Sequence, residues 1–134
     1  MNGSVLAPGT AAGRALVLDE PLSLWGGLDP ASGLVIDPHH PRRGADLSGR
    51  VLVMRAVRGS SSSSSVLAEA VRSGHAPAAL LLGEPDLILA VGSVVAAELY
   101  GHRVPVVLLP PERLAEIREG DQVAVSADGS VRVG

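Results

Sequence analysis

A run of six serines is the part of this chain that is richest in groups able to do chemistry. Ser60 to Ser65 follow Arg58 and Gly59, between an apolar stretch typical of a buried strand and an amphipathic stretch typical of a helix. A helix N-terminus carries roughly half a positive charge, so this junction can bind a carboxylate, a phosphate or an alkoxide. Arg58 can bind such an anion through two hydrogen bonds. The alternative is a flexible polar linker, which rarely separates a buried strand from the helix that packs on it.

The serine run does not fit a conventional serine hydrolase or a metal site. A hydrolase needs the pattern Gly-x-Ser-x-Gly and a histidine base, but Gly59 is followed by serines alone. His75 and His102 each follow an expected short helix, whose terminal carbonyls explain them. Adjacent His39 and His40 point apart in an extended chain, so we expect a surface loop there rather than a metal site.

The composition excludes several classes of protein. With 134 residues the chain is long enough for one domain with a core, residues 1–134. The net charge is −3 and every cation is arginine, so no basic block supports nucleic-acid binding. Without cysteine the chain can hold neither a disulfide nor a thiolate-ligated metal or cluster. Since no signal peptide or membrane-length apolar stretch is evident, we expect a cytoplasmic protein without membrane partners.

Strands and helices alternate from residue 50 onward, which predicts an α/β domain. Continuous apolar runs predict strands covered on both faces, and amphipathic stretches closed by glycine predict helices. The expected strands are 4–7, 15–18, 33–36, 51–54, 78–82, 104–109, 122–126 and 130–133, and the expected helices are 66–73, 92–99 and 110–117. Residues 19–49 form a long loop-rich segment, which in a compact domain is often functional.

Two smaller features allow both a functional and a structural interpretation. Trp25, the single tryptophan, precedes Gly26 and Gly27. An indole beside glycines often lines a site where backbone approaches a ligand, and a core or lid anchor explains it equally well. Glu84 and Asp86 favour a solvated turn over an acid pair for proton transfer.

Several motifs in order resemble the aconitase X small subunit, also called the aconitase X swivel domain. The motifs are PLSLWGGLD at 21–29, HP at 40–41, LSGRVLV at 47–53, RGSSS at 58–62, GHAPAA at 74–79 and VPVV at 104–107. Together they cover nearly the whole chain, so the resemblance is far more specific than any single motif.

The resemblance implies the swivelling β/β/α fold of the aconitase mobile domain and a heteromeric dehydratase. It implies a larger cysteine-bearing partner subunit that holds an iron–sulfur cluster, whose iron is expected to bind the leaving hydroxyl as a Lewis acid. This chain itself is expected to bind no metal or cofactor. Family members dehydrate cis-3-hydroxy-L-proline in bacteria and mevalonate 5-phosphate in archaea. The all-arginine, Ala/Gly-rich composition favours a bacterial source and the first substrate; Arg42 and Arg43 could serve the phosphate of the second.

The resemblance also assigns the site residues. In the family, the serine directly after Arg-Gly is the base that removes a proton, which is Ser60 here. A free serine hydroxyl is too weakly acidic for this, so the helix N-terminus and Arg58 would have to stabilise its alkoxide. The expected substrate-binding residues are Trp25, Gly26, Arg58, Gly59, Ser61 and Ser62.

The chain departs from the family at Ser63 and Ser65, where glycine is usual. If either glycine has a positive φ or contacts substrate closely, serine would distort the loop. The alternative from another functional class is a non-catalytic anion-binding or docking module, in which the serine run only caps a helix or binds phosphate.

Overall fold

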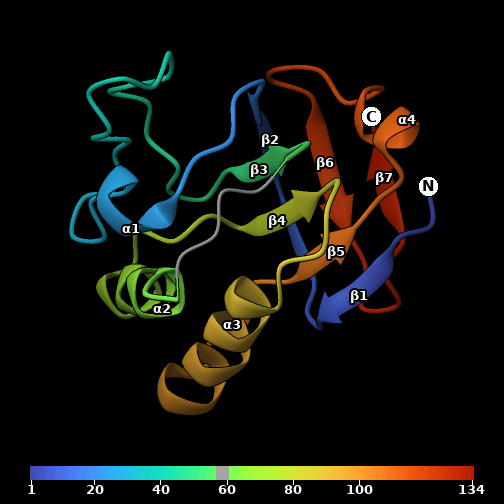
Figure 1. Cartoon of the computed structure of the whole chain (residues 1–134). Coiled ribbons are helices and arrows are strands. Elements are labelled where there is room, and N and C mark those ends of the chain that lie inside the picture. The colour runs from blue at the N-terminus through green and yellow to red at the C-terminus, as the bar shows by residue number, and fades with distance from the viewer. Residues whose placement is uncertain (57–60) are drawn as a thin grey trace.

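The computed structural model describes residues 1–56 and 61–134, which form a layered α/β structure (Figure 1). In chain order the elements are β1 (Ser4–Ala7), β2 (Ala11–Leu18), α1 (Leu24–Gly27), β3 (Val51–Met54), α2 (Ser63–Ser73), β4 (Ala79–Leu82), α3 (Leu87–Tyr100), β5 (Val106–Leu108), α4 (Pro111–Leu114), β6 (Gln122–Val125) and β7 (Val131–Val133). The strands in these residues form one seven-stranded sheet of order β1-β5-β4-β3-β2-β6-β7.

The centre of the sheet is parallel and its flanks are antiparallel. β2, β3, β4 and β5 pair in parallel, whereas β1 pairs antiparallel with β5, and β6 and β7 extend the sheet antiparallel beyond β2. Every residue of β3 and β4 is buried. Strands covered on both faces must be apolar at every position, and this explains their continuous hydrophobic runs.

Two hydrophobic cores lie on opposite faces of the sheet. Leu52 and Leu80 face the core beneath α2 and α3, to which α1 also contributes. Val53 and Leu81 face the core that includes the α4 region and residues of β6 and β7. Figure 1 shows α2 and α3 together on one side of the sheet and α4 on the other. The predicted α/β class is confirmed.

The α3 helix is longer than the sequence pattern predicted, and Asp86 is the reason for its start. The Asp86 carboxylate accepts hydrogen bonds from the backbone N–H groups of Ile88 and Leu89 at 2.9 and 3.0 Å, so Asp86 is the N-cap. Asp86 is buried, and the expectation of a solvated turn was wrong for this residue. Glu84 is exposed.

Other boundaries also differ from expectation. β2 begins at Ala11, where it pairs with β6, and α2 begins inside the serine run at Ser63. The strand expected at 33–36 is reduced to isolated bridges at Leu34 and Val35. Among the described residues, no helix is long and apolar enough to cross a membrane.

The α2 and α3 helices pack unusually closely at Gly92. A Cβ atom on Gly92 would lie 2.8 Å from the Ser64 Cα and 2.9 Å from the Ser64 carbonyl oxygen. At its other side α3 is tied to the segment before β5, because the Ser93 hydroxyl donates a hydrogen bond to the Val104 carbonyl. The position of α3 therefore determines where the first turn of α2 lies.

Candidate functional site

The carboxyl ends of the parallel strands meet at one edge of the sheet, which is where open α/β sheets bind ligands. The chain leaves β3 at Met54 on this edge and enters α2 at Ser63. Arg58, Gly59 and Ser60 lie between them but outside the described residues, so their assignment to the site stays a prediction.

Ser61 and Ser62 lie directly before α2. Ser61 is exposed, and its carbonyl accepts a hydrogen bond of 3.2 Å from the Ser64 hydroxyl. Ser62 occupies the N-cap position, and its carbonyl accepts a hydrogen bond from the Val66 N–H at 3.2 Å. The serine run therefore crosses the beginning of a helix of 11 residues, which is the geometry that anion binding at a helix N-terminus requires.

Trp25 and Gly26 belong to the short α1 segment, which contacts α2. The Trp25 residue is 61% exposed, so it is not the core anchor that the sequence allowed as an alternative. Gly26 has a φ of 77°, a conformation that strongly favours glycine. Buried Leu24 and Gly27 hold this turn in place. The fold thus places the Trp25 turn and the serine-run helix on neighbouring elements.

Ser63 and Ser65 fit their positions without backbone strain. Both lie in α2, and no residue other than glycine has a positive φ in ranges 1–56 and 61–134. A glycine-only conformation is therefore not needed at either position in this chain. Ser63 instead carries a free-energy cost of burial, because it is 2% exposed and its hydroxyl has no hydrogen-bond partner among the residues that the structure describes.

Replacing Ser63 by alanine should stabilise the protein by about 1 kcal/mol, because an unsatisfied buried hydroxyl costs free energy and alanine favours the helix. Thermal unfolding of Ser63→Ala measures this. Ser64→Ala is the matched control, since it removes a hydroxyl that is hydrogen-bonded, and it should not stabilise. A Ser63→Ala protein that melts below wild type would show that the hydroxyl has a partner.

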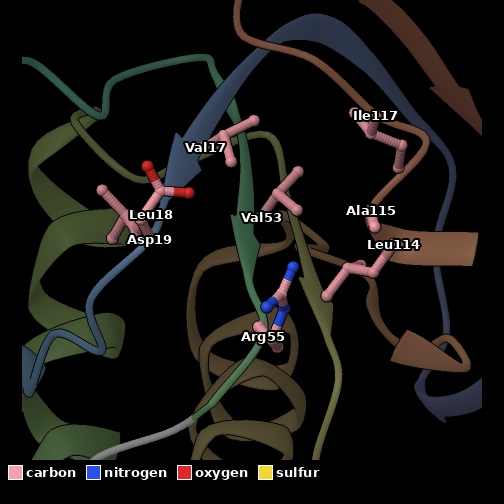
Figure 2. A pocket seen from close by; sticks show the side chains of 8 residues that line it. All are labelled: Val17, Leu18, Asp19, Val53, Arg55, Leu114, Ala115 and Ile117. Carbon is pink, nitrogen blue, oxygen red and sulfur yellow. The ribbon is translucent and has the colours of Figure 1, made fainter. Parts of the chain in front are cut away.

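A cavity of about 190 Å³ opens at the carboxyl ends of β2 and β3 (Figure 2). It is lined by Val17, Leu18, Asp19, Val53, Arg55, Leu114, Ala115 and Ile117. Val53, Leu114 and Ile117 belong to the core on the α4 side of the sheet. The cavity therefore lies across the sheet from α1 and α2, and its lining includes none of the predicted site residues that the structure describes, which are Trp25, Gly26, Ser61 and Ser62.

Arg55 is the residue at this edge that sequence reasoning missed. It directly follows β3, and in Figure 2 its guanidinium reaches toward Val53 and Leu114. Arg55 is exposed and makes no hydrogen bond or ion pair with the described residues. The available signal was its position, because a charged residue directly after a buried parallel strand lies at the ligand-binding edge.

Arg42 is engaged elsewhere and does not face an open anion site. Its guanidinium binds both carboxylate oxygens of Glu119 at 3.0 and 3.2 Å, and Arg50 donates to the same carboxylate at 3.0 Å. The backbone N–H of Val17 donates a hydrogen bond to the Glu119 carboxylate at 2.8 Å. Val17 lies in the part of β2 that does not pair with β6. Hydrogen bonds from Arg42 lower the pKa of Glu119 to about 2. Arg42 is thus a structural residue in this chain.

Replacing Glu119 by glutamine should lower the free energy of unfolding by about 1 kcal/mol at pH 7, a modest value because the carboxylate is half exposed. Because folding lowers the pKa of Glu119, the carboxylate contributes fully to the free energy of unfolding above about pH 4.5. This contribution is lost as the pH falls toward 2. The melting temperatures of Glu119→Gln and wild type should therefore converge in acid. Glu116→Gln is the control, because Glu116 forms an exposed ion pair with Arg113. A difference in melting temperature between Glu119→Gln and wild type that does not change with pH would contradict the stabilising role of the Glu119 carboxylate.

The histidines make local structural contacts. His40 is buried, contrary to the expected surface loop: its Nε2 lies 3.0 Å from the Glu20 carbonyl and its Nδ1 accepts from the Arg42 N–H at 3.0 Å. His75 Nδ1 lies 3.3 Å from the Ser48 hydroxyl. Within the described residues no group of three His, Asp or Glu side chains could hold a metal. The chain also has no cysteine, so its residues do not fit an iron–sulfur cluster.

Comparison with known proteins identifies the family. The family model described as the aconitase X swivel domain matches residues 1–133. The chain belongs to this family. The fold agrees: the crystal structure of Thermococcus kodakaraensis aconitase X in its holo-form matches with a TM-score of 0.87 and 30% identity, over 99% of this chain and 96% of that chain. The predicted swivelling fold is therefore confirmed.

The relatives of this swivel domain are dehydratases with two different substrates in their names. The cis-3-hydroxy-L-proline dehydratase of Pseudomonas aeruginosa is 50% identical over 112 residues, which are 84% of this chain. The chain spans only about a fifth of the length of that relative, 19%. The phosphomevalonate dehydratase small subunit of Methanopyrus kandleri is 41% identical over 122 residues, which are 90% of this chain and 85% of that subunit.

Proposed function

We propose that this swivel domain is the serine-bearing subunit of a heteromeric aconitase-X-type dehydratase that acts on cis-3-hydroxy-L-proline. The observation that carries the proposal is its 50% identity to the Pseudomonas aeruginosa enzyme of that name, across most of the chain. The fold supports it, because the serine run crosses the start of α2 at the ligand-binding edge of the sheet.

The substrate assignment has a second candidate, mevalonate 5-phosphate. Its support is that this chain matches phosphomevalonate dehydratase small subunits over most of their own length, 85% in Methanopyrus kandleri. Two observations favour hydroxyproline instead. The identity to the hydroxyproline enzyme is higher. Of Arg42 and Arg43, which the sequence offered for a phosphate, Arg42 is paired with Glu119, whereas Arg43 is exposed.

In the proposed reaction Ser60 acts as the base. Its alkoxide takes the proton from the carbon that bears the carboxylate, the electron pair of that C–H bond forms the new double bond, and hydroxide leaves from the adjacent carbon. Arg58 and the N-terminus of α2 lower the free energy of the alkoxide. Gly59, Ser61 and Ser62 bind the substrate carboxylate, and the Trp25–Gly26 turn covers the site from α1.

The iron–sulfur cluster of the enzyme belongs, in this proposal, to a larger cysteine-bearing subunit. The chain described here has no cysteine and supplies the proton-accepting group and the carboxylate-binding groups. Neither subunit is expected to turn over substrate alone, because the base and the cluster lie on different polypeptides.

The test of substrate is an assay of the purified two-subunit complex with each candidate compound. We expect dehydration of cis-3-hydroxy-L-proline by the complex and by neither subunit alone. Turnover of mevalonate 5-phosphate alone would transfer the assignment to the second candidate. A complex inert toward both compounds would favour the non-catalytic anion-binding or docking module.

A further inference from the structure

The outer face of α3 is an apolar surface that no other part of the described chain covers. This face consists of the side chains of Leu87, Val91, Val94, Val95 and Leu99. Between 42% and 70% of each residue is exposed. Their spacing of three or four positions places them in one stripe along the helix.

The composition of α3 makes this exposure unusual. Glu98 is the only charged residue among its 14 residues. A helix that is apolar around its whole circumference is ordinarily buried on all sides. The inner side of α3 meets this expectation, since Leu89 and Ala96 are buried in the core. An exposed apolar surface along one side of such a helix is characteristic of an interaction site.

An open groove lies beside this face, between α3 and the edge strand β1. It has a volume of about 300 Å³ and is lined by Leu6 of β1, by Ala90 and by residues of the outer face. Among the residues that the structure describes, the groove lining contains no charged side chain. Nucleic acids and anionic lipid headgroups are bound by clustered cations, so the chemistry of the groove fits an apolar protein surface.

The α3 helix connects its outer face to the candidate site at two positions, Leu87 and Gly92. α3 follows β4 in the chain, so Leu87 lies at the edge of the sheet where the parallel strands end. Gly92, on the side facing α2, lies against the Ser64 backbone with no room for a Cβ. A partner that holds α3 therefore also holds the first turn of α2, which contains the last three residues of the serine run.

We infer that the outer face of α3 and its groove dock the larger dehydratase subunit. This inference rests on the proposed function, which requires such a subunit. The matched segment is 19% of the Pseudomonas aeruginosa relative, so most of that protein lies outside the swivel domain and can cover this face. A partner seated at Leu87 also reaches the candidate site, whereas a second copy of this chain would bring no cluster to it.

The test measures the affinity between this chain and the larger protein of the same organism that resembles the remainder of the Pseudomonas aeruginosa enzyme. Val91→Asp with Val94→Asp should weaken binding by about a hundredfold, since charge in the centre of an apolar interface removes its main contacts. Leu34→Asp, an exposed leucine in the loop before β3, is the matched control and should change affinity by less than about twofold. The melting temperature of each isolated variant checks that it folds.

If the aspartate pair prevents folding, Val91→Ser with Val94→Ser serves instead and should weaken binding by about tenfold. Unchanged affinity in a folded double variant would overturn the docking inference and leave the proposed function intact. A homodimer of the isolated chain that the same variants dissociate would also overturn it, because a second copy would then occupy the face. An unsubstituted chain that does not bind the larger protein would overturn both proposals.

Discussion

Replacing Ser60 by alanine should reduce dehydration by the complete enzyme about a thousandfold, within the range expected for removal of a general base. The alanine side chain cannot accept the substrate proton, while Gly59, Ser61 and Ser62 remain to bind the substrate carboxylate. We therefore expect kcat to fall with little change in KM. The measurement is steady-state turnover of cis-3-hydroxy-L-proline by the purified complex.

Two controls make this result specific to proton removal. Ser65→Ala changes an exposed serine of the same run and should leave kcat within about twofold of wild type. Exchange of the substrate proton with deuterium from solvent should disappear in Ser60→Ala and persist in Ser65→Ala. If Ser60→Ala retains most of its turnover, the serine run is only a helix cap or an anion site, and the base lies elsewhere.

Replacing Gly92 by valine should lower the free energy of unfolding by about 3 kcal/mol, which corresponds to a fall in melting temperature of roughly 10 °C. The first added atom alone would lie 2.8 and 2.9 Å from the Ser64 backbone. Backbone cannot rotate away as a side chain does, so α2 and α3 must separate. The gain in helix propensity is less than about 1 kcal/mol and does not offset this.

Ala97→Val is the matched control for Gly92→Val, because it adds bulk to the same helix at a half-buried position. We expect a loss below about 1 kcal/mol there. A separated α2 also moves Ser61 and Ser62 directly before it, so Gly92→Val should reduce kcat of any complex that still assembles. A Gly92→Val protein with the same melting temperature as wild type would mean that α2 and α3 do not pack as described.

The sequence predicted those parts of the fold that depend on local pattern. The buried strand at 51–54 and the end of α2 at Gly74 were both predicted, the first from a continuous apolar run and the second from a glycine whose φ is 82°. The start of α3 was missed because residues 87–91 are all apolar. A segment without polar positions has no helical periodicity to read.

The sequence predicted the chemistry of the candidate site but not the contacts between distant segments around it. Its chemistry follows from the serine run and from a family resemblance, and the fold adds that the Trp25 turn packs beside α2. Arg55 and the Glu119 cluster were not predictable, since each depends on segments far apart in the sequence. Glu119 binds Arg42 across 77 positions, and no local pattern encodes such a pair.

A native pull-down tests most directly whether this chain supplies the base of a two-subunit dehydratase. The tagged chain is recovered from its own organism, every co-purified protein is identified by mass, and iron is assayed. We expect one larger, cysteine-bearing, iron-containing protein in equal amount, in a complex that dehydrates cis-3-hydroxy-L-proline. A chain recovered alone and without iron would contradict it.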